Sequence, residues 1–390
     1  MRKALTLILP LFLCACTSGE KFSREVVRSE MDRCPEASFI DGQNGSLKWN
    51  YTTGLELKAF LDVFEAYGDE EIFSYVDKWY DGIISEDGTI YKYKKSNYST
   101  DHICPGRTLF SLYDLTGKEK YRYAMDTLYS QIKEQPRTKE GGFWHKAAYP
   151  HQMWLDGLYM AQPFYAEYTQ RYVSDPAEKK ANYEDIVHQF KTVYEYTYDP
   201  GTTLLRHAWD SSHEMFWCDP STGQSAHAWG RALGWFSMAL VEVIPFIPEE
   251  NGRDELVSIL GKTIAAVREF ADPETGMWYQ VIDSPGREGN YLEATCSAMF
   301  TYAMLKGTRL GILEGVSRKE AMGTYSKLLD AFVRVDGNGL VNLDSCCEVA
   351  GLGGNNNRKG DFDYYIHEPV RSNDPKGIGP LIWAALETEK

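Results

Sequence analysis

Positive charge is scarce in this sequence. Its 390 residues include 41 lysines and arginines against 56 aspartates and glutamates, which gives a formal net charge of −15. Proteins bind nucleic acids mainly through basic side chains, so this balance argues against a nucleic-acid partner. An anionic ligand would need a local basic pocket in an otherwise acidic protein.

The sequence also lacks the spacings that metal sites require. Beyond the N-terminal segment no CxxC pair occurs, and no cysteine stands at a zinc-type distance from a histidine. We therefore predict no metal and no other cofactor, and we expect mostly buried free thiols. In an oxidising compartment, the adjacent Cys346 and Cys347 could instead form disulfide bonds with other cysteines. The sequence does not determine which cysteines would pair. The cysteines concerned are Cys34, Cys104, Cys218, Cys296, Cys346 and Cys347.

The apolar run at the N-terminus is too short to span a membrane as a stable helix. Arg2 and Lys3 precede an apolar stretch over residues 4–13, the pattern of a secretory signal. The LCAC that follows resembles a bacterial lipobox. We predict that residues 1–16 are a lipoprotein signal segment ending at a lipidated Cys16, which anchors a periplasmic or cell-surface protein to a membrane. Plain secretion is the alternative.

Aromatic residues are abundant. They make up 14% of the chain, with 10 Trp and 26 Tyr. Such side chains combine a flat apolar face with a polar tip, which suits a sugar ring, although most of them are expected to be core. With 43% hydrophobic residues the chain can bury a large core. Its length suggests two domains, but a closed toroid or barrel of this length can be a single domain.

A repeating pattern runs from Trp49 onward. Helical stretches alternate with Gly-bearing turns that are followed by a few β-prone residues, and these pieces start at residues 87, 141, 200, 274 and 336. The intervals of about 54 to 74 residues each hold two helices, which is typical of a repeat architecture. About six helical hairpins without capping repeats predict an all-α (α/α)6 toroid, with the turn-strand pieces at one end. A two-domain α+β protein is the alternative.

Helix signals agree with this prediction. The sequence predicts a helix in the segment 53–70 that stops at Gly68. It also predicts two helices joined by a turn over 107–136, and a helix over 229–245. We expect residues 17–45 to form a polar lead-in and 46–390 to form the toroid. The Gly/Asn-rich segment 350–363 is expected to be an exposed loop.

The stretch from 141 to 164, GGFWHKAAYPHQMWLDGLYMAQPF, concentrates candidate functional residues. Asp156 stands between Leu155 and Gly157 at the start of an apolar helical run. A carboxyl group flanked by Trp154 and Leu155 is poorly solvated, so we expect its pKa to be raised toward neutrality. A helix N-cap is the competing interpretation.

Further candidates fall at corresponding places in other repeats. Asp101 precedes a predicted helix start, and His207 follows the turn-strand piece at 200. In WGRALGW, Arg231 and Trp235 are four residues apart and are expected to stack on one helix face, with Trp229 at its start. Singly, Asp101 is more simply a cap, His207 a core histidine and Arg231 a partner of an acid such as Glu242. In a toroid all would face one pocket.

Three segments resemble unsaturated rhamnogalacturonyl hydrolases, glycoside hydrolase family 105. They are GGFWHK…YPHQMWLDGLYMAQPF, HAWGRALGWFSMAL and YYIHEPVRSNDPKGIGP, and the similarity covers roughly residues 45–388. The resemblance implies an (α/α)6 barrel, no metal, the catalytic acid at Asp156 and a second acid at Asp101. The sequence around Asp101, STDHICPGR, departs most from the family pattern. The substrate contacts implied are Tyr51, His145, Lys146, Trp154, His207, Trp229, Arg231 and Trp235.

The resemblance also implies a reaction. The substrate would be an oligosaccharide with a 4,5-unsaturated uronic acid at its non-reducing end, most simply a rhamnogalacturonan fragment of pectin. The enzyme would remove that sugar by hydrating its double bond, with Asp156 as proton donor and acceptor and Asp101 in support. The alternatives are an unsaturated glucuronyl hydrolase acting on glycosaminoglycan-type or other uronyl oligosaccharides, and a non-catalytic glycan-binding lipoprotein.

Overall fold

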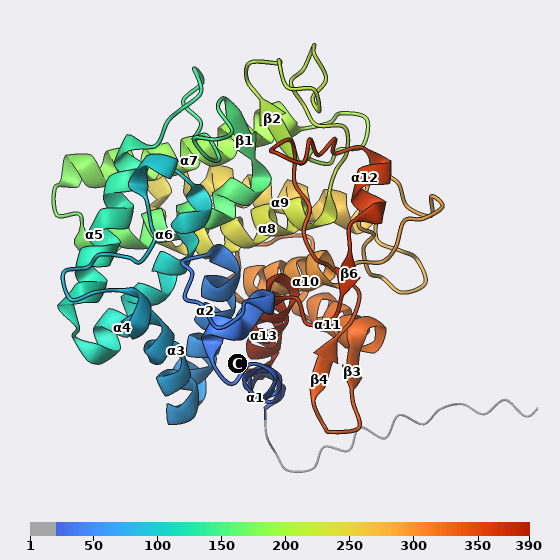
Figure 1. Ribbon diagram of the computed structural model, residues 1–390. Coiled ribbons are helices and arrows are strands. Elements are labelled where there is room, and N and C mark those ends of the chain that lie inside the picture. Colours follow the sequence, from blue (N-terminus) through green and yellow to red (C-terminus); the bar gives the residue numbers. More distant parts are fainter. Residues whose placement is uncertain (1–20) are drawn as a thin grey trace, which may run out of the picture.

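The computed structural model describes residues 21–390, and it is a closed ring of helices (Figure 1). Six inner helices lie around the ring, and α13 closes it between α10 and α2. A 3-10 turn over Cys104–Arg107 leads into α4 and makes the contacts between α2 and α6. The inner helices are α2 (Tyr51–Tyr67), α4 (Thr108–Thr116), α6 (Leu155–Tyr172), α8 (Gly230–Val243), α10 (Ala294–Arg309) and α13 (Pro375–Glu389).

Each inner helix packs against one outer helix. Five of the six pairs are consecutive in sequence, and the sixth joins α13 to α1, from the other end of the described chain. This arrangement confirms the predicted (α/α)6 toroid. The outer helices are α1 (Phe22–Arg33), α3 (Glu70–Ile83), α5 (Glu119–Glu134), α7 (Pro176–Thr197), α9 (Arg253–Glu269) and α11 (Arg318–Phe332).

The prediction of a polar lead-in over residues 17–45 is wrong for α1. Val26 and Val27 of this helix are 0% exposed and belong to the main core. The backbone N–H and the hydroxyl of Ser23 donate to the two carboxylate oxygens of Glu389 on α13, at 3.0 and 2.6 Å. Because α1 has few apolar residues, its composition hid its role as the sixth outer helix. The signal segment and Cys16 lie outside the described residues.

Local signals set the helix ends that were predicted. The side chain of Asn50 accepts from the N–H of Thr53 at 2.8 Å and caps α2, which ends at Gly68 in the left-handed conformation with φ 72°. Gly117, with φ 65°, turns the chain between α4 and α5 as the sequence predicted. The helix expected over 229–245 is α8.

The strands are short and form three antiparallel pairs. The turn-strand pieces predicted at 87 and 141 make only isolated bridges, Ile84 with Ile90 and Arg137 with Phe143. Strands β1 and β2 lie near the short helix α12 (Phe362–His367) at the upper end of the ring in Figure 1. The pairs are β1 (Gln152–Trp154) with β2 (Ala208–Asp210), β3 (Val333–Val335) with β4 (Val341–Leu343), and β5 (Cys346–Cys347) with β6 (Val370–Arg371).

The glycine-rich segment 350–363 is not simply an exposed loop. Leu352 is 0% exposed and packs with Trp154 and Trp217 in a small second core. The exposed residues of the segment are 354–357, Lys359 and Asp363. Leu352, which stands between two glycines, thus packs the loop against Trp154, at the end of the ring where the predicted site residues lie. Over residues 21–390, no helix combines the length and apolar character that crossing a bilayer requires.

The buried face of α1 can be tested by truncating one side chain. We expect Val27→Ala to lower the free energy of unfolding by about 2 kcal/mol, since two buried methyl groups are lost and a small cavity remains. Val335→Ala is the matched control, because Val335 is 61% exposed, and its effect should stay below about 0.5 kcal/mol. Urea denaturation with an unchanged m-value measures both. Equal effects of the two variants would contradict the assignment of α1 to the core.

Candidate active site

Several predicted site residues meet because inner helices begin at the same end of the ring. Tyr51 is the first residue of α2, Asp156 the second of α6 and Arg231 the second of α8. Helix N-termini carry partial positive charge and favour nearby anions. The mouth of the ring therefore joins residues that are far apart in the sequence, as the toroid predicted.

Backbone hydrogen bonds connect the loops that line the mouth. The N–H of Thr100 donates to the carbonyl of His145 at 3.0 Å, and the N–H of His145 donates to the carbonyl of Gln152 at 2.8 Å. On the other side of β1, the N–H of Leu155 donates to the carbonyl of His207 at 3.1 Å. These bonds hold the neighbourhoods of Asp101, His145, Asp156 and His207 in one frame.

Asp101 forms an ion pair with Lys146. The other carboxylate oxygen of Asp101 lies 3.4 Å from Nε2 of His145. Burial favours a higher pKa for Asp101, but the charge and hydrogen bond of Lys146 together with the nearby histidines outweigh it, and the pKa is lowered. The same pairing raises the pKa of Lys146 despite its burial. Asp101 is thus held as a carboxylate, and the structure brings Asp101, His145 and Lys146 together.

Asp156 lies against His207. Its Oδ2 is 3.2 Å from Nε2 of the fully buried imidazole. Burial acts to raise the pKa of Asp156, as the flanking Trp154 and Leu155 led us to expect, but His207 and then His145 lower it below the ordinary value. The expected upward shift is therefore wrong. Sequence reasoning saw the apolar neighbours and could not see a histidine supplied by another repeat.

His145 is clamped in a stack of flat rings. Its ring lies 4.6 Å from that of Trp154 at an interplanar angle of 6°, and the ring of Tyr149 is parallel to both, 5.1 Å from Trp154 and 6.3 Å from His145. Burial lowers the pKa of His145 to about 4, so it is neutral at pH 7. At Gly157, a Cβ atom would lie 3.1 Å from Nδ1 of His145, so glycine permits this close approach.

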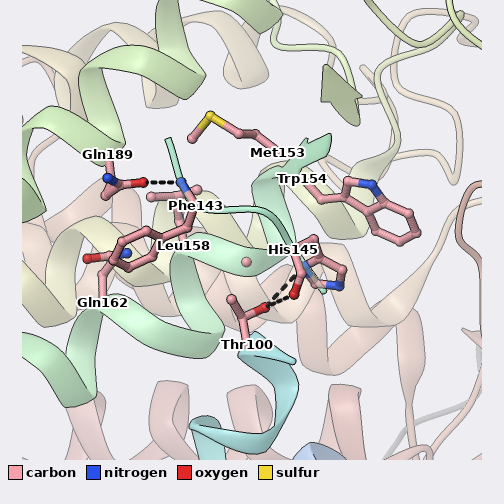
Figure 2. Close-up of a pocket in the computed structure, with 9 residues that line it drawn as sticks. Thr100, Phe143, His145, Met153, Trp154, Leu158, Gln162 and Gln189 are labelled. Atoms are coloured by element: carbon pink, nitrogen blue, oxygen red, sulfur yellow. Dashed lines mark hydrogen bonds between the residues drawn. The ribbon is translucent and has the colours of Figure 1, made fainter. Parts of the chain in front are cut away.

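A small pocket lies behind His145, on the core side of the stack (Figure 2). The hydroxyl of Thr100 lies 3.1 Å from Nδ1 of His145, and Gln189 accepts from the N–H of Phe143 at 2.7 Å. The carbonyl oxygen of the Gln162 side chain is buried there without a hydrogen-bond partner. The pocket is lined by Thr100, Phe143, His145, Met153, Trp154, Gly157, Leu158, Gln162 and Gln189.

Arg231 is buried at the start of α8. Its guanidinium donates to the carbonyl of Cys347 at 2.6 Å and lies 4.7 Å from the ring centre of Trp229. The spacing in WGRALGW had predicted a stack with Trp235, and the structure has Trp229 instead, because the arginine side chain turns back toward the helix N-terminus. Glu242, the other predicted partner of Arg231, pairs with Arg107 at 2.8 Å.

Trp235 and Tyr51 lie together deeper in the ring. Trp235 is 1% exposed, with the ring of Tyr51 edge-on at 6.3 Å and that of Tyr159 at 4.8 Å. Burial raises the pKa of the Tyr51 hydroxyl well above its ordinary value, so it stays protonated. Substrate contact by Trp235 remains a prediction, since its closest aromatic neighbours are tyrosines of the protein.

The sequence analysis missed three residues that border the site. Tyr149 extends the stack, and its hydroxyl accepts from Nη2 of Arg358 at 3.1 Å. The hydroxyl of Tyr365 lies 2.7 Å from Nδ1 of His207. Tyr365 stands in the YYIHEPVRSNDPKGIGP segment that carried a family resemblance, but no local pattern distinguished it from its neighbours. Arg358 stands in the glycine-rich loop, where an exposed loop was expected.

Metal-ligating side chains do not gather anywhere in residues 21–390: no three of His, Cys, Asp and Glu are placed to hold an ion together. All six cysteines of this range are free thiols. Cys104, Cys296, Cys346 and Cys347 are buried, while Cys34 and Cys218 are half-buried.

The family comparison covers nearly the whole described chain. Residues 22–390 match the model described as Glycosyl Hydrolase Family 88. The structure is similar to one titled as a glycoside hydrolase from family 105 of C. acetobutylicum ATCC 824, with 42% identity and a TM-score of 0.89 over 95% of this chain and 99% of that one. Both findings agree with the resemblance seen in the motifs.

Two further relatives mark the range of similarity. The "24.9 kDa protein in picA locus" of Rhizobium radiobacter is 37% identical over 235 residues, which are 59% of this chain and 98% of that protein. An unsaturated glucuronyl hydrolase from Bacillus sp. GL1, described as responsible for glycosaminoglycan degradation, is 13% identical with a TM-score of 0.68, over 94% of this chain and 95% of that one. At that identity the likeness concerns the fold alone.

Proposed function

The chain belongs to glycosyl hydrolase family 88 and is a glycoside hydrolase of the unsaturated uronyl type, and from this premise we propose its substrate and mechanism. The substrate is a pectin-derived oligosaccharide, of the rhamnogalacturonan kind, with a 4,5-unsaturated uronic acid at its non-reducing end. The enzyme acts from that end and removes the unsaturated sugar by hydrating its double bond.

The charge balance of the mouth supports an anionic substrate, and it is the observation on which this proposal chiefly depends. The mouth holds two carboxylates, Asp101 and Asp156, and three cations, Lys146, Arg231 and Arg358, while Asp374 and Glu293 also act on Arg231. Of these cations, Lys146 is paired with Asp101, whereas Arg231 and Arg358 donate to carbonyl and hydroxyl oxygens. A uronate carboxylate would give Arg231 or Arg358 an anionic partner. Flat walls from Trp154, Trp229 and Tyr149 suit a sugar ring.

Asp156 carries the proton in the proposed reaction. In the free protein its carboxyl is ionised, because His207 lowers its pKa. A bound uronate brings a second negative charge and displaces water, and both effects raise the pKa of Asp156 and favour its protonated form. Asp156 then protonates C4, which leaves oxocarbenium character at C5 and the ring oxygen. The resulting carboxylate accepts a proton from the water that attacks C5.

The rest of the reaction follows from the product of hydration. Addition of water gives a hemiketal at C5, which opens and releases the remaining sugar. Common glycosidases instead place two carboxylates around the glycosidic bond. Here Asp101, kept ionised by Lys146, has a supporting role: it accepts hydrogen bonds from ring hydroxyls and influences the protonation of Asp156 through its charge.

Substrate class can be tested with a panel of unsaturated disaccharides from pectin and from glycosaminoglycans. We expect the ultraviolet absorbance of the double bond to disappear fastest with the rhamnogalacturonan disaccharide, the substrate that the resemblance of the sequence motifs implies. The measurement is kcat/KM for each disaccharide. Preference for a glycosaminoglycan disaccharide would assign the enzyme to the glucuronyl class instead.

Replacing the proposed acid tests the mechanism. Asp156→Asn keeps the size of the side chain but can neither give nor take the proton, so turnover should fall by about 10⁴-fold or more. Binding measured by calorimetry should change little. Asp101→Asn, the matched control, should also be slow but retain measurable turnover. If Asp156→Asn keeps more than about a tenth of the wild-type rate, Asp156 is not the acid and Asp101 becomes the candidate. The structure already excludes a helix cap, because Trp154 is the N-cap residue of α6 and Asp156 is its second residue.

We also propose that the enzyme is a lipoprotein anchored through Cys16. The support is the short apolar run and lipobox-like LCAC that precede the polar residues 17–21. Cys16→Ser should move the protein from the membrane fraction to the soluble fraction without lowering its specific activity. Membrane retention of this variant equal to wild type would exclude the anchor.

A further inference from the structure

We propose that Tyr365 is a positioning residue for the reaction: its hydroxyl fixes the tautomer of His207, and so determines whether a hydrogen or a lone pair faces Asp156. This inference rests on the proposed role of Asp156 as proton donor and acceptor. Tyr365 comes from α12, and His207 precedes β2 by one residue. The C-terminal part of the chain would thus set a proton position for a carboxylate on α6.

The three side chains contact one another in series, with His207 between Tyr365 and Asp156. Nδ1 of His207 lies 2.7 Å from the hydroxyl of Tyr365, and Nε2 lies 3.2 Å from Oδ2 of Asp156. His207 and Tyr365 are both 0% exposed. Each ring nitrogen of the histidine therefore faces one oxygen of the protein, and the state of one nitrogen determines the state of the other.

The imidazole is held in a fixed orientation. The ring centre of Trp229 lies 4.7 Å from that of His207, and the ring of Trp154 meets it edge-on at 5.3 Å. The backbone on both sides is tied, because the N–H of His207 donates to the carbonyl of His227 at 3.2 Å and its carbonyl accepts from Leu155 at 3.1 Å. With the ring fixed, what can vary is the position of its hydrogen.

The chemistry of the pair gives that position. A neutral imidazole has one donor nitrogen and one acceptor nitrogen. Burial raises the pKa of Tyr365 well above its ordinary value, so the hydroxyl keeps its proton and can donate it to Nδ1. The hydrogen of His207 is then on Nε2, which lies 3.2 Å from Oδ2 of Asp156. The two atoms are not aligned for a hydrogen bond, so this hydrogen stabilises the carboxylate through its partial positive charge. With phenylalanine at 365, nothing would prevent the opposite tautomer, whose lone pair would repel that carboxylate.

Tyr365 is itself held on several sides. Its ring stacks on Trp229 at 5.8 Å and 18°, and its carbonyl accepts from Nε2 of Gln280 at 3.2 Å. The Oε1 of the same glutamine accepts from Nε1 of Trp229 at 3.1 Å. One glutamine thus links the backbone of Tyr365 to the indole on which Tyr365 stacks, so the hydroxyl has a defined direction.

Other titratable or charged groups act on these three side chains, and they stay unchanged when Tyr365 alone is replaced. Among them His145 is neutral at pH 7, with a pKa of about 4. The difference between variant and wild type therefore isolates the hydroxyl. The groups are Tyr51 on α2, Asp101 and His145 in the loops before α4 and β1, Asp283 before α10, and Arg358 and Tyr364 near Tyr365.

The test compares Tyr365→Phe with Tyr364→Phe, the adjacent tyrosine, whose hydroxyl accepts from the N–H of Gly351 at 3.0 Å. We expect kcat of Tyr365→Phe to fall by about 10- to 100-fold, as when a partner that orients a functional histidine is lost, with KM within about twofold. The limb of kcat/KM that descends as pH rises should move to higher pH, since the Asp156 carboxylate loses the partial positive charge that stabilises it. Tyr364→Phe should leave both unchanged.

A spectroscopic readout separates this role from general support of the fold. In protein labelled with ¹⁵N-histidine, wild-type His207 should show the Nε2–H tautomer, and Tyr365→Phe should lose it. An Nδ1–H tautomer in the wild type, or an unchanged tautomer and pH profile in the variant, would overturn the proposal even if the variant folds poorly. Failure of the proposed function would be seen separately, as an active Asp156→Asn with the tautomer change intact.

Discussion

The packing of α13 between α10 and α2 is the constraint on which the rest of the structure depends. It closes the ring, and closure is what brings the helix N-termini to a common mouth. The contact of α13 with α1 then covers the outside of the closing helix. A hydrogen-bonded cluster at Glu389, which accepts from Ser23 of α1 and from Tyr67 of α2 at 2.7 Å, ties the three helices together.

The electrostatics of the mouth follow from the same geometry. Each of the two acids has a nitrogen base from a different loop: Asp101 has Lys146, and Asp156 has His207. Both acids are consequently ionised before a substrate arrives, although each is buried. Burial alone would have made proton donors of them. The protein thus holds both acids as anions. In the proposed reaction an anionic ligand raises the pKa of Asp156 when it binds, so that Asp156 takes up its proton only when substrate is bound.

The sequence predicted the architecture well and the electrostatics poorly. Repeat spacing and caps such as Gly68 and Gly117 are local features, so the toroid and its helices could be predicted. The pKa of Asp156 depends on His207, 51 positions further along, and the stacking of Arg231 depends on rotamer direction. Neither the pKa of Asp156 nor the rotamer of Arg231 can be deduced from the adjacent residues of the sequence. The role of α1 was hidden because an outer helix needs only a narrow apolar stripe, here Val26 and Val27.

The order of synthesis has a consequence for how this ring matures. Because α13 is made after the five other inner helices, a growing chain holds an open ring whose apolar flanks on α2 and α10 still face solvent. Such surfaces aggregate readily and are the kind that chaperones cover. A product truncated before α12 would retain Asp101, Asp156 and Arg231 yet lack both Tyr365 and the closing helix. The C-terminal segment must therefore be synthesised before the ring can close, and the ring and its mouth then form together.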